Sequence, residues 1–381
     1  MQMGSFSDAR DSSHRAAPFR LGRRHRAMNL LNLTPNDAER SIAVWVAERG
    51  EPPYRLRQIF PRLWTHPAAD WTGVTELPRA LIDDLTTSAP ICRLQLQTRQ
   101  TSTDGTVKFL WRLHDGLAVE SVWIPEGRRR TLCISSQAGC AFGCVFCATG
   151  RMGFQRHLDP WEITGQVREL LLDPEFGKPT NVVFMGMGEP LHNWDAVDKA
   201  LTILNDPHGF GIGARHITVS TVGIVPKLAR LAARPEQFRL AISLHAAVSE
   251  RRAAIMPVEK KYPIGKLMEA LRAFARRITF EYVLIKGAND SVRDADELAK
   301  IATPLGALVN ILPLHPGGAA GLTPVAAGPT RQFARRLKEL GVNVTVRRSR
   351  GLDISAACGQ LRTETDLAAS LPSTTVTSSS N

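Results

Sequence analysis

The chain has 381 residues, 43% of them hydrophobic, and a formal net charge of +12 at pH 7. This length is enough for one large domain and a small one, and the hydrophobic content excludes wholesale disorder. No run of about 18 or more apolar residues occurs, so we expect no membrane-spanning helix. The basic excess, which includes pairs such as Arg251–Arg252, favours a nucleic-acid partner, although a solvated basic surface would give the same composition.

The six cysteines are too few and too clustered for a disulfide scaffold, so we expect a reducing compartment, the cytoplasm. Residues 1–27 are rich in arginine and lack the apolar segment of a secretory signal. They are expected to form a disordered basic arm, with a transit peptide as the alternative. Residues 363–381 are mostly threonine, serine and alanine, which predicts a disordered tail.

Residues 28–95 show a helical pattern that prolines interrupt. The predicted helical stretches are Asp37–Arg49, Tyr54–Trp64 and Leu77–Leu85. The middle stretch mixes basic and aromatic residues, which suits a small RNA-binding accessory domain and equally suits a packed helix with arginines at its rim. Residues 96–130 alternate like strands around an Asp104–Gly105 turn, so we expect a β-hairpin extension there.

From residue 131 onward, strand-like and helical runs alternate. The strand-like runs are Thr131–Ser136, Asn181–Gly186, His216–Val222, Arg239–His245, Thr279–Ile285 and Leu308–Leu314, and Val342–Arg347 resembles one more strand. The helical runs are Trp161–Leu172, Trp194–Asn205, Pro226–Ala233, Pro263–Arg277, Val292–Thr303 and Arg331–Leu340. Such repeats make a parallel α/β sheet with right-handed crossovers. The pattern alone leaves open a closed or partial barrel and a doubly wound sheet.

A loop after the first of these strands carries Cys140, Cys144 and Cys147, spaced CxxxCxxC. Three thiolates can hold three irons of a [4Fe–4S] cluster and leave the fourth iron open to a small chelating molecule. A structural zinc would need a fourth cysteine or histidine nearby, and His157 is the candidate, but no paired-ligand pattern follows Cys147. Zinc and plain redox thiols remain the alternatives.

Small and polar residues end the next three strands. Gly186–Pro190 follows the second strand, Ser220 ends the third, and Ser243–His245 ends the fourth. Sites in α/β barrels form where strands run into their following loops, so these residues are candidate ligand contacts. Taken alone, each has a structural explanation, because glycines often mark turns and small hydroxyls usually bond locally. Cys133 and Cys358 are likewise compatible with buried small hydrophobic residues.

The cysteine spacing, with Phe146 before the last cysteine, resembles the radical S-adenosylmethionine (SAM) superfamily. Longer segments resemble one branch of it, the RlmN/Cfr-type adenine methyltransferases of ribosomal and transfer RNA. These segments are VESVWIPE (119–126), CISSQAGCAFGCVFCATG (133–150), NVVFMGMGEPLHN (181–193), ITVSTVGIVP (217–226), AISLHA (241–246) and RSRGLDISAACGQL (348–361). The resemblance implies a six-stranded partial (β/α) barrel over residues 131–362, ending in a catalytic loop, with a small N-terminal helical domain.

The resemblance also implies the roles of individual residues. Cys140, Cys144 and Cys147 would hold a [4Fe–4S] cluster. SAM would contact Gly188, Glu189, Ser220, Ser243, Leu244 and His245. His315 stands where the family carries asparagine, and an imidazole does not offer the paired donor and acceptor of an amide, so the SAM contact there is open.

Three further residues are implied to carry the chemistry. Cys358 would be methylated first, and a 5′-deoxyadenosyl radical would then take hydrogen from its S-methyl group, so that the methylene adds to adenine. Cys133 would release the product by forming a disulfide with Cys358. Glu120 would be the acid–base residue that takes the proton from the adduct, although a solvent-facing strand carboxylate is the simpler explanation from the residue alone.

The predicted enzyme therefore methylates C2 of an adenine in 23S ribosomal RNA, with transfer RNA as a further substrate, and uses two SAM molecules per turnover. The base would have to leave its stack to meet Cys358. The resemblance also implies an electron donor such as flavodoxin or ferredoxin, no membrane and a monomeric state. The alternatives are methylation at C8, a radical SAM enzyme with a non-RNA substrate, and a zinc-stapled RNA-binding module.

Overall fold

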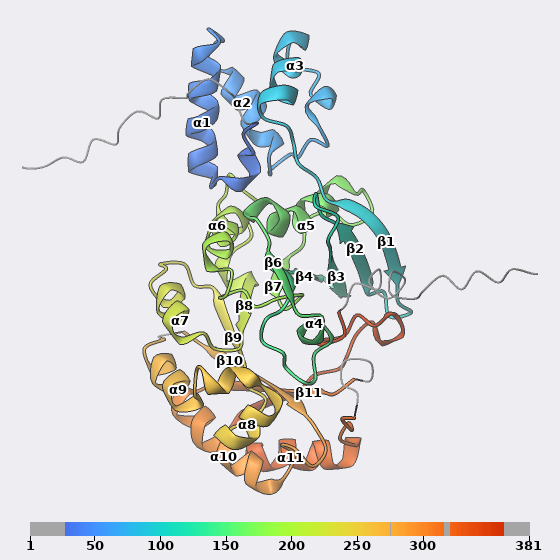
Figure 1. Ribbon diagram of the computed structural model, residues 1–381, viewed down its shortest axis with the longest axis vertical. Helices are drawn as coiled ribbons and strands as arrows, with labels where there is room; N and C mark the ends of the chain where they lie inside the picture. The colour runs from blue at the N-terminus through green and yellow to red at the C-terminus, as the bar shows by residue number, and fades with distance from the viewer. Residues whose placement is uncertain (1–26, 275, 316–320, 362–381) are drawn as a thin grey trace, which may run out of the picture.

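The computed structural model describes residues 27–274, 276–315 and 321–361. Except for residue 27, the predicted basic arm lies outside the described residues, as does the predicted tail. A ten-stranded sheet in the order β1-β2-β3-β4-β7-β8-β9-β10-β11-β12 forms the centre of the molecule, and β5 and β6 make a separate two-stranded sheet (Figure 1). No helix in the described part of the chain is both long and apolar enough to cross a membrane.

The N-terminal part is helical, as predicted. It contains η1 (Leu30–Asn32), α1 (Pro35–Glu48), α2 (Arg55–Ile59), η2 (Phe60–Arg62), η3 (Trp71–Gly73) and α3 (Arg79–Ser88). Helix α1 begins where the Thr34 side chain accepts a hydrogen bond from the Asp37 backbone, with proline in the first turn. Buried tryptophans, among them Trp64 and Trp71, fill the small core of this domain, which lies above the sheet in Figure 1.

Buried Arg168 joins the helical domain to the rest of the protein. It lies on α5 (Pro160–Leu172), and its Nε donates to the Leu63 carbonyl at 2.9 Å. Its guanidinium also donates to the Ala68 carbonyl. The Trp161 backbone N–H donates to the Asn32 side chain at 3.1 Å. The accessory domain is therefore held to the sheet by hydrogen bonds that α5 supplies.

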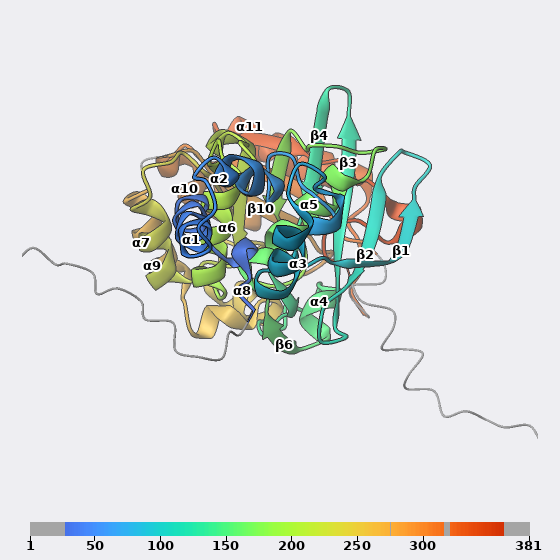
Figure 2. The ribbon, with the colours of Figure 1, turned by 90° about the horizontal axis from the view of Figure 1, so that it is seen from above.

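The predicted hairpin extension is three antiparallel strands that continue the main sheet. These are β1 (Gln95–Thr101), β2 (Val107–Arg112) and β3 (Ala118–Glu126), followed by β4 (Arg129–Cys133), which pairs antiparallel with β3. Figure 2 shows these strands on the side of the molecule away from α7, α9 and α10. Lys108 pairs with Val122, and Val122 pairs with Cys133, so these three side chains share one face of the sheet.

From β4 onward the strands of the main sheet are parallel, and each lies beside the next main-sheet strand in chain order. They are β7 (Asn181–Phe184), β8 (Ile217–Thr221), β9 (Arg239–Ser243), β10 (Ile278–Leu284), β11 (Leu308–Pro313) and β12 (Asn343–Val346). A doubly wound sheet would reverse its strand order part-way, and this sheet does not. The partial barrel is therefore confirmed, with β12 as the additional predicted strand.

The predicted connecting helices are present. They are α5, α6 (Trp194–Asn205), α7 (Val225–Ala232), α9 (Ile264–Arg272), α10 (Val292–Ala302) and α11 (Ala327–Glu339). The sequence analysis missed several short elements: α4 (Ala148–Arg151), α8 (Ser249–Ile255), β5 (Gln137–Gly139), β6 (Phe154–His157), η4 (Ala214–His216), η5 (Pro257–Lys260), η6 (Thr303–Leu305) and η7 (Leu352–Ile354). Four of these elements follow a strand directly along the chain: β5 follows β4, α4 follows β5, α8 follows β9 and η7 follows β12. Helix α4 and strand β6 are labelled in Figure 1.

Candidate active site

The three motif cysteines lie on one loop between β5 and α4. Cys144 is buried, and Cys140 and Cys147 are half-buried. Burial raises the pKa of the Cys140 thiol to about 12, and the charges of Cys147 and Cys140 add to the rise in the pKa of Cys144. The three sulfurs are therefore close enough for their charges to interact. Thiols in this state need a positive partner, such as iron, before they ionise at neutral pH.

Backbone hydrogen bonds fix the shape of this loop. The Cys140 N–H donates to the Gly153 carbonyl at 2.8 Å, and the Val145 N–H donates to the Ile255 carbonyl at 3.1 Å. Gly139, with φ +73°, must be glycine, because an added Cβ would lie 1.9 Å from the Gly153 oxygen. The short β5–β6 pair thus holds Cys140 in place, and the end of α8 holds the segment just before Cys147.

The donor set fits a cluster better than a single metal ion. Among the described residues, no three Cys, His, Asp or Glu side chains converge on a point that would hold one ion. A cubane needs sulfurs at separate corners, because each thiolate binds a different iron. Three thiolates on one loop are the donor set that such a cubane requires, one for each of three irons.

The glycines after β7 serve a packing role. A Cβ on Gly188, where φ is +94°, would lie 2.5 Å from the Gln137 Cβ, and one on Gly186 would lie 2.7 Å from the Ile134 carbonyl carbon. The Met187 carbonyl accepts hydrogen bonds from the backbone N–H groups of Ser136 and Gln137. This loop therefore lies directly against the chain that leads into the cysteines.

Glu189 is buried and has several donors of its own. Its carboxylate accepts from Thr221 Oγ1 at 2.5 Å, from the Val222 N–H at 2.9 Å and from the Leu191 N–H at 3.0 Å. Burial raises its pKa to about 7, against the effect of these three donors. The carboxylate therefore joins the loops after β7 and β8. A contact with SAM, as predicted, would use the lone pairs of Glu189 that these three hydrogen bonds do not occupy.

The predicted contacts after β8 and β9 lie at adjacent strand ends. Ser220 is buried in β8, and Ser243 is half-buried at the end of β9. The backbone N–H groups of Leu244 and His245 both donate to the Glu281 carbonyl, at 3.1 and 3.3 Å. Both donors thus meet one carbonyl within β10, that of Glu281, which is the residue that pairs with Ser243.

His245 has an unusual backbone and a fixed tautomer. Its φ is +56°, in the left-handed region, where non-glycine residues are uncommon. Its Nδ1 accepts from the Val283 N–H at 3.0 Å, and burial together with the charge of Arg252 lowers its pKa to about 3. The imidazole is therefore neutral and carries its proton on Nε2. Its ring packs edge-on against Phe146 at 4.6 Å, in the cysteine loop.

Arg252 corrects the sequence analysis, which counted it in a basic pair available to RNA. Its side chain is fully buried and pairs with Glu259 at 2.5 Å. It also donates to the carbonyls of Leu244 at 3.1 Å and Val222 at 2.8 Å. These carbonyls follow β9 and β8, so Arg252 ties two site loops together and does not reach solvent.

His315 follows β11 and is half-buried. Its Nε2 hydrogen-bonds to the Ser349 hydroxyl, and burial lowers its pKa, so the ring is neutral at pH 7. Ser349 belongs to the segment that leads from β12 to Cys358. The departure from the family's asparagine therefore occurs at a residue that contacts the segment leading to Cys358.

Glu120 and Cys133 lie on neighbouring strands. Glu120 is buried, not solvent-facing, and its Oε1 lies 3.2 Å from the Nζ of Lys108. Lys108 was not predicted as a site residue, because only the register of β2 and β3 puts it on the Glu120 face. Cys133 ends β4 and is buried, and both its burial and the charge of Cys358 raise its pKa.

Cys358 lies in the loop after η7. Its side chain is exposed, yet surrounding protein raises its pKa, as do the charges of Glu281 and Cys147, while Arg347 lowers it. The charge of Cys358 in turn raises the pKa of Cys133. Cys358, the only exposed cysteine in the described part of the chain, is thus brought near two cysteines that stand more than two hundred positions earlier.

Comparisons with known proteins agree with this geometry. Residues 134–299 match the Radical SAM superfamily. The chain is 56% identical over 337 residues to the probable dual-specificity RNA methyltransferase RlmN of Gemmatimonas aurantiaca, covering 88% of this chain and 93% of that protein. The chain belongs to the RlmN family of radical SAM enzymes.

Two further relatives support this membership. The dual-specificity RNA methyltransferase RlmN of Anaeromyxobacter dehalogenans is 43% identical over 334 residues, covering 85% of this chain and 90% of that protein. A solved radical SAM methyltransferase from Sphaerobacter thermophilus superposes with a TM-score of 0.83 at 43% identity, covering 88% of this chain and 99% of that one. RlmN-family enzymes use a [4Fe–4S] cluster and SAM, so the alternative of a non-catalytic zinc module is wrong.

Proposed function

We propose that this RlmN-family enzyme methylates C2 of an adenine in 23S ribosomal RNA, and an adenine of transfer RNA, through a methylcysteine at Cys358. The names of its relatives support methylation of RNA in general, without specifying the nucleotide or the carbon. One observation carries the proposed route: the Ala148 N–H donates to the Gly359 carbonyl at 2.8 Å, which joins the residue after Cys147 to the residue after Cys358, and the charge of Cys358 also reaches buried Cys133. A methylcysteine route needs this pair of extra thiols, whereas an ordinary radical SAM enzyme does not.

Cys140, Cys144 and Cys147 would hold the [4Fe–4S] cluster, which would supply the electron for reductive cleavage of bound SAM. Cys358 carries the methyl group taken from a first SAM, gives up one hydrogen of that group, and adds the remaining methylene to adenine. The adenine C2 is not nucleophilic and so cannot attack a methyl sulfonium by itself. A thiol exposed beside the cluster loop meets the geometric requirement of both steps.

Glu120 would take the proton from the radical adduct, whose unpaired electron would return to the cluster, and the Cys133 thiolate would then attack the Cys358 sulfur. This would break the carbon–sulfur bond, a proton would add to the released carbon to complete the methyl group, and a disulfide would remain for an external thiol to reduce. The ion pair with Lys108 at 3.2 Å favours the ionised, proton-accepting form of Glu120. The strand register supports the arrangement, because Glu120 and Cys133 lie on one face of adjacent strands.

SAM is proposed to bind at the adjoining strand ends, along Gly188, Glu189, Ser220, Ser243–His245 and His315. The neutral His245 and His315 rings each offer one hydrogen bond, and the packed glycine loop brings backbone groups close to the cysteines. Electrons come from a small donor protein such as flavodoxin or ferredoxin, and the enzyme acts as a monomer. The helical domain at residues 28–95 would help to bind the RNA.

The test compares Cys358→Ala, Cys133→Ala and Cys92→Ala in the reconstituted enzyme. Cys358→Ala should abolish RNA methylation while SAM cleavage persists, and Cys133→Ala should trap a protein–RNA crosslink. Cys92 lies in the connection between α3 and β1, outside this site, so Cys92→Ala is the control that keeps both activities. Methylation by Cys358→Ala would overturn the methylcysteine route. Nucleoside analysis of the digested RNA then separates C2 from C8, and ribosomal from transfer RNA.

A further inference from the structure

The turn between β1 and β2 contacts the loop that carries Cys358. Ser102 Oγ donates to Asp353 Oδ1 at 2.5 Å, and the Thr103 N–H donates to Asp353 Oδ2 at 3.1 Å. The Gly351 N–H donates in return to Asp104 Oδ2 at 3.1 Å. Both carboxylates are therefore bonded across the contact, one from each segment.

The turn is built to present these groups. Asp104 uses its other oxygen, Oδ1, to accept from the Thr106 N–H at 2.9 Å, and the Ser102 N–H donates to the Thr106 carbonyl at 2.8 Å. The bonds to Thr106, Gly351 and Ser102 lower the pKa of Asp104 to about 2, despite the opposing effect of burial. Asp104 is therefore ionised at neutral pH, and one carboxylate both closes the turn and binds the loop.

Close packing accompanies the hydrogen bonds. Gly351 has φ +61°, and a Cβ added there would lie 2.7 Å from the Ala356 Cβ and 3.0 Å from Thr106 Cγ2. The loop thus turns sharply against the hairpin just before η7. Arg350 also lies 4.0 Å from Asp104 and 3.9 Å from Glu126, which adds two longer ion pairs to the same contact.

The far end of the loop is fixed to a different element. The Gly359 carbonyl accepts from the Ala148 N–H at 2.8 Å, and the Leu361 carbonyl accepts from Thr149 Oγ1 at 2.7 Å. Ala148 directly follows Cys147, the last cysteine of the cluster loop. Cys358 therefore lies between two attachment points, one on the hairpin and one on α4.

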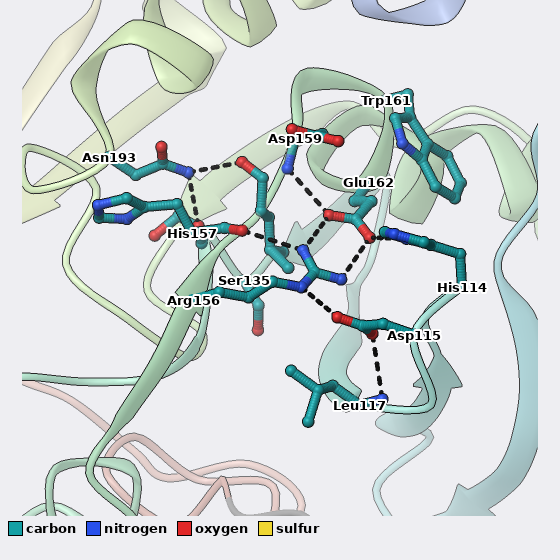
Figure 3. Close-up of polar contacts among 12 residues, drawn as sticks. His114, Asp115, Leu117, Ser135, Arg156, His157, Asp159, Trp161, Glu162 and Asn193 are labelled. Carbon is teal, nitrogen blue, oxygen red and sulfur yellow. Dashed lines mark hydrogen bonds and ion pairs between the residues drawn. The ribbon is translucent and has the colours of Figure 1, made fainter. Parts of the chain in front are cut away.

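The other end of β2 is also held in place, which restrains the position of the Ser102–Thr106 turn. Figure 3 shows Arg156 between Asp115, in the turn after β2, and Glu162 on α5. Arg156 donates to both oxygens of Glu162, at 2.7 and 2.8 Å, and His114 Nδ1 lies 3.1 Å from the same carboxylate. Continuous pairing along β1, β2 and β3 connects this anchor to the turn at Ser102–Thr106.

We propose that the Ser102–Thr106 turn is a clamp that holds the Cys358 loop over the cluster loop, with Asp353 and Asp104 as positioning residues. The proposal rests on the proposed role of Cys358. That thiol has to face SAM, adenine and Cys133 in succession, so its loop needs a defined resting position. Contacts at the loop's start, near solvent, can supply this position without touching the reacting atoms.

The experiment uses the full-length, reconstituted enzyme with three variants. Asp353→Ala removes both acceptors on the loop, and Asp353→Asn keeps one. Thr103→Pro removes the backbone donor to Asp353 but favours the turn, because position 103 is the second residue of a β-turn closed by Gly105 and Ser102. Asp206→Ala is the matched control, since Asp206 accepts a similar local bond from the His208 N–H at 2.8 Å.

Three quantities are measured: kcat and KM for RNA methylation, and hydrogen exchange of residues 351–361. Loss of hydrogen bonds to a charged group can reduce the population of the clamped loop about tenfold. Asp353→Ala should therefore lower kcat about tenfold. Its KM for RNA should change less than about twofold, because the clamp does not contact the RNA in this scheme. Hydrogen exchange of the loop should rise in Asp353→Ala. The kcat and exchange values of Asp353→Asn and Thr103→Pro should lie between those of Asp353→Ala and those of the Asp206→Ala control.

Unchanged exchange or unchanged kcat in Asp353→Ala and Thr103→Pro would overturn the clamp. If Asp353→Ala does not fold, Thr103→Pro decides by the same two measurements. The proposed function fails separately, through methylation by Cys358→Ala. If Cys358→Ala still methylates RNA, hydrogen exchange of the loop in Asp353→Ala still tests the contact with the hairpin. A fall in kcat in Asp353→Ala could then no longer be explained by the position of Cys358.

Discussion

The Nζ of Lys108 lies 3.2 Å from Oε1 of Glu120, and their side chains are only 7% and 4% exposed. The register places Lys108 beside Val122 and Cys133 on one face of the sheet, and Glu120 lies two residues before Val122 on the same face. A buried carboxylate without its cation is strongly disfavoured. Lys108 therefore stabilises the ionised form of the residue that we propose as the proton acceptor.

Lys108→Met should lower the free energy of unfolding by about 3 kcal/mol, because it removes the ammonium group that lies 3.2 Å from the buried Glu120 carboxylate. The double variant Lys108→Met/Glu120→Gln should recover most of this loss, since the buried negative charge is removed as well. It should not recover RNA methylation. Chemical denaturation and a methyl-incorporation assay on the same preparations separate the two effects. Full activity in the double variant would contradict the proposed role of Glu120.

The buried pair of Arg252 and Glu259 gives a second prediction. Arg252→Ala should destabilise the protein by about 3 to 5 kcal/mol, because Glu259 and the carbonyls of Val222 and Leu244 lose their buried donor. Arg230→Ala is the matched control. Its partner Asp195 is 85% exposed and Arg230 itself 51%, so a change under about 1 kcal/mol is expected. Equal melting temperatures for the two variants would refute the structural role of Arg252.

The order of elements followed from the sequence, because buried parallel strands alternate with amphipathic helices along the chain. The cysteine loop followed as well, since its spacing is local and its chemistry depends on residue type. The family resemblance decided between a barrel and a doubly wound sheet, which alternation cannot separate. The strand order confirmed that choice.

Contacts between distant segments were not predictable in the same way. Arg252 stands in a charged pair that suggests a surface, and its burial depends on its hydrogen bonds to two carbonyls beyond β8 and β9. Lys108 becomes a partner of Glu120 only once the register of β2 and β3 is known. The contact of Asp353 with Ser102 joins positions 251 residues apart, and no local pattern marks either residue.

The packed glycine after β7 gives a third prediction. Gly188→Ala should destabilise the enzyme and weaken SAM binding, because the new Cβ would lie 2.5 Å from the Gln137 Cβ at a backbone φ of +94°. Gly265→Ala is the control, since no atom lies within 4 Å of its added Cβ and it stands in α9, where alanine is favoured. Thermal unfolding and SAM binding by calorimetry test both. If Gly188→Ala binds SAM as the parent does, the loop is more adaptable than its packing indicates.

The last prediction concerns the cluster ligands. Cys144 is buried among Cys140 and Cys147, whose charges raise its pKa, so its thiol is expected to ionise only when iron neutralises it. Cys144→Ala should therefore lose most of its iron and sulfide after anaerobic reconstitution, and with them the visible absorption band and reductive SAM cleavage. Cys358→Ala should retain all of these, because Cys358 is proposed to carry the methyl group and not iron. Iron and sulfide analysis of the two variants side by side decides the assignment, and equal iron in both would exclude Cys144 as a ligand.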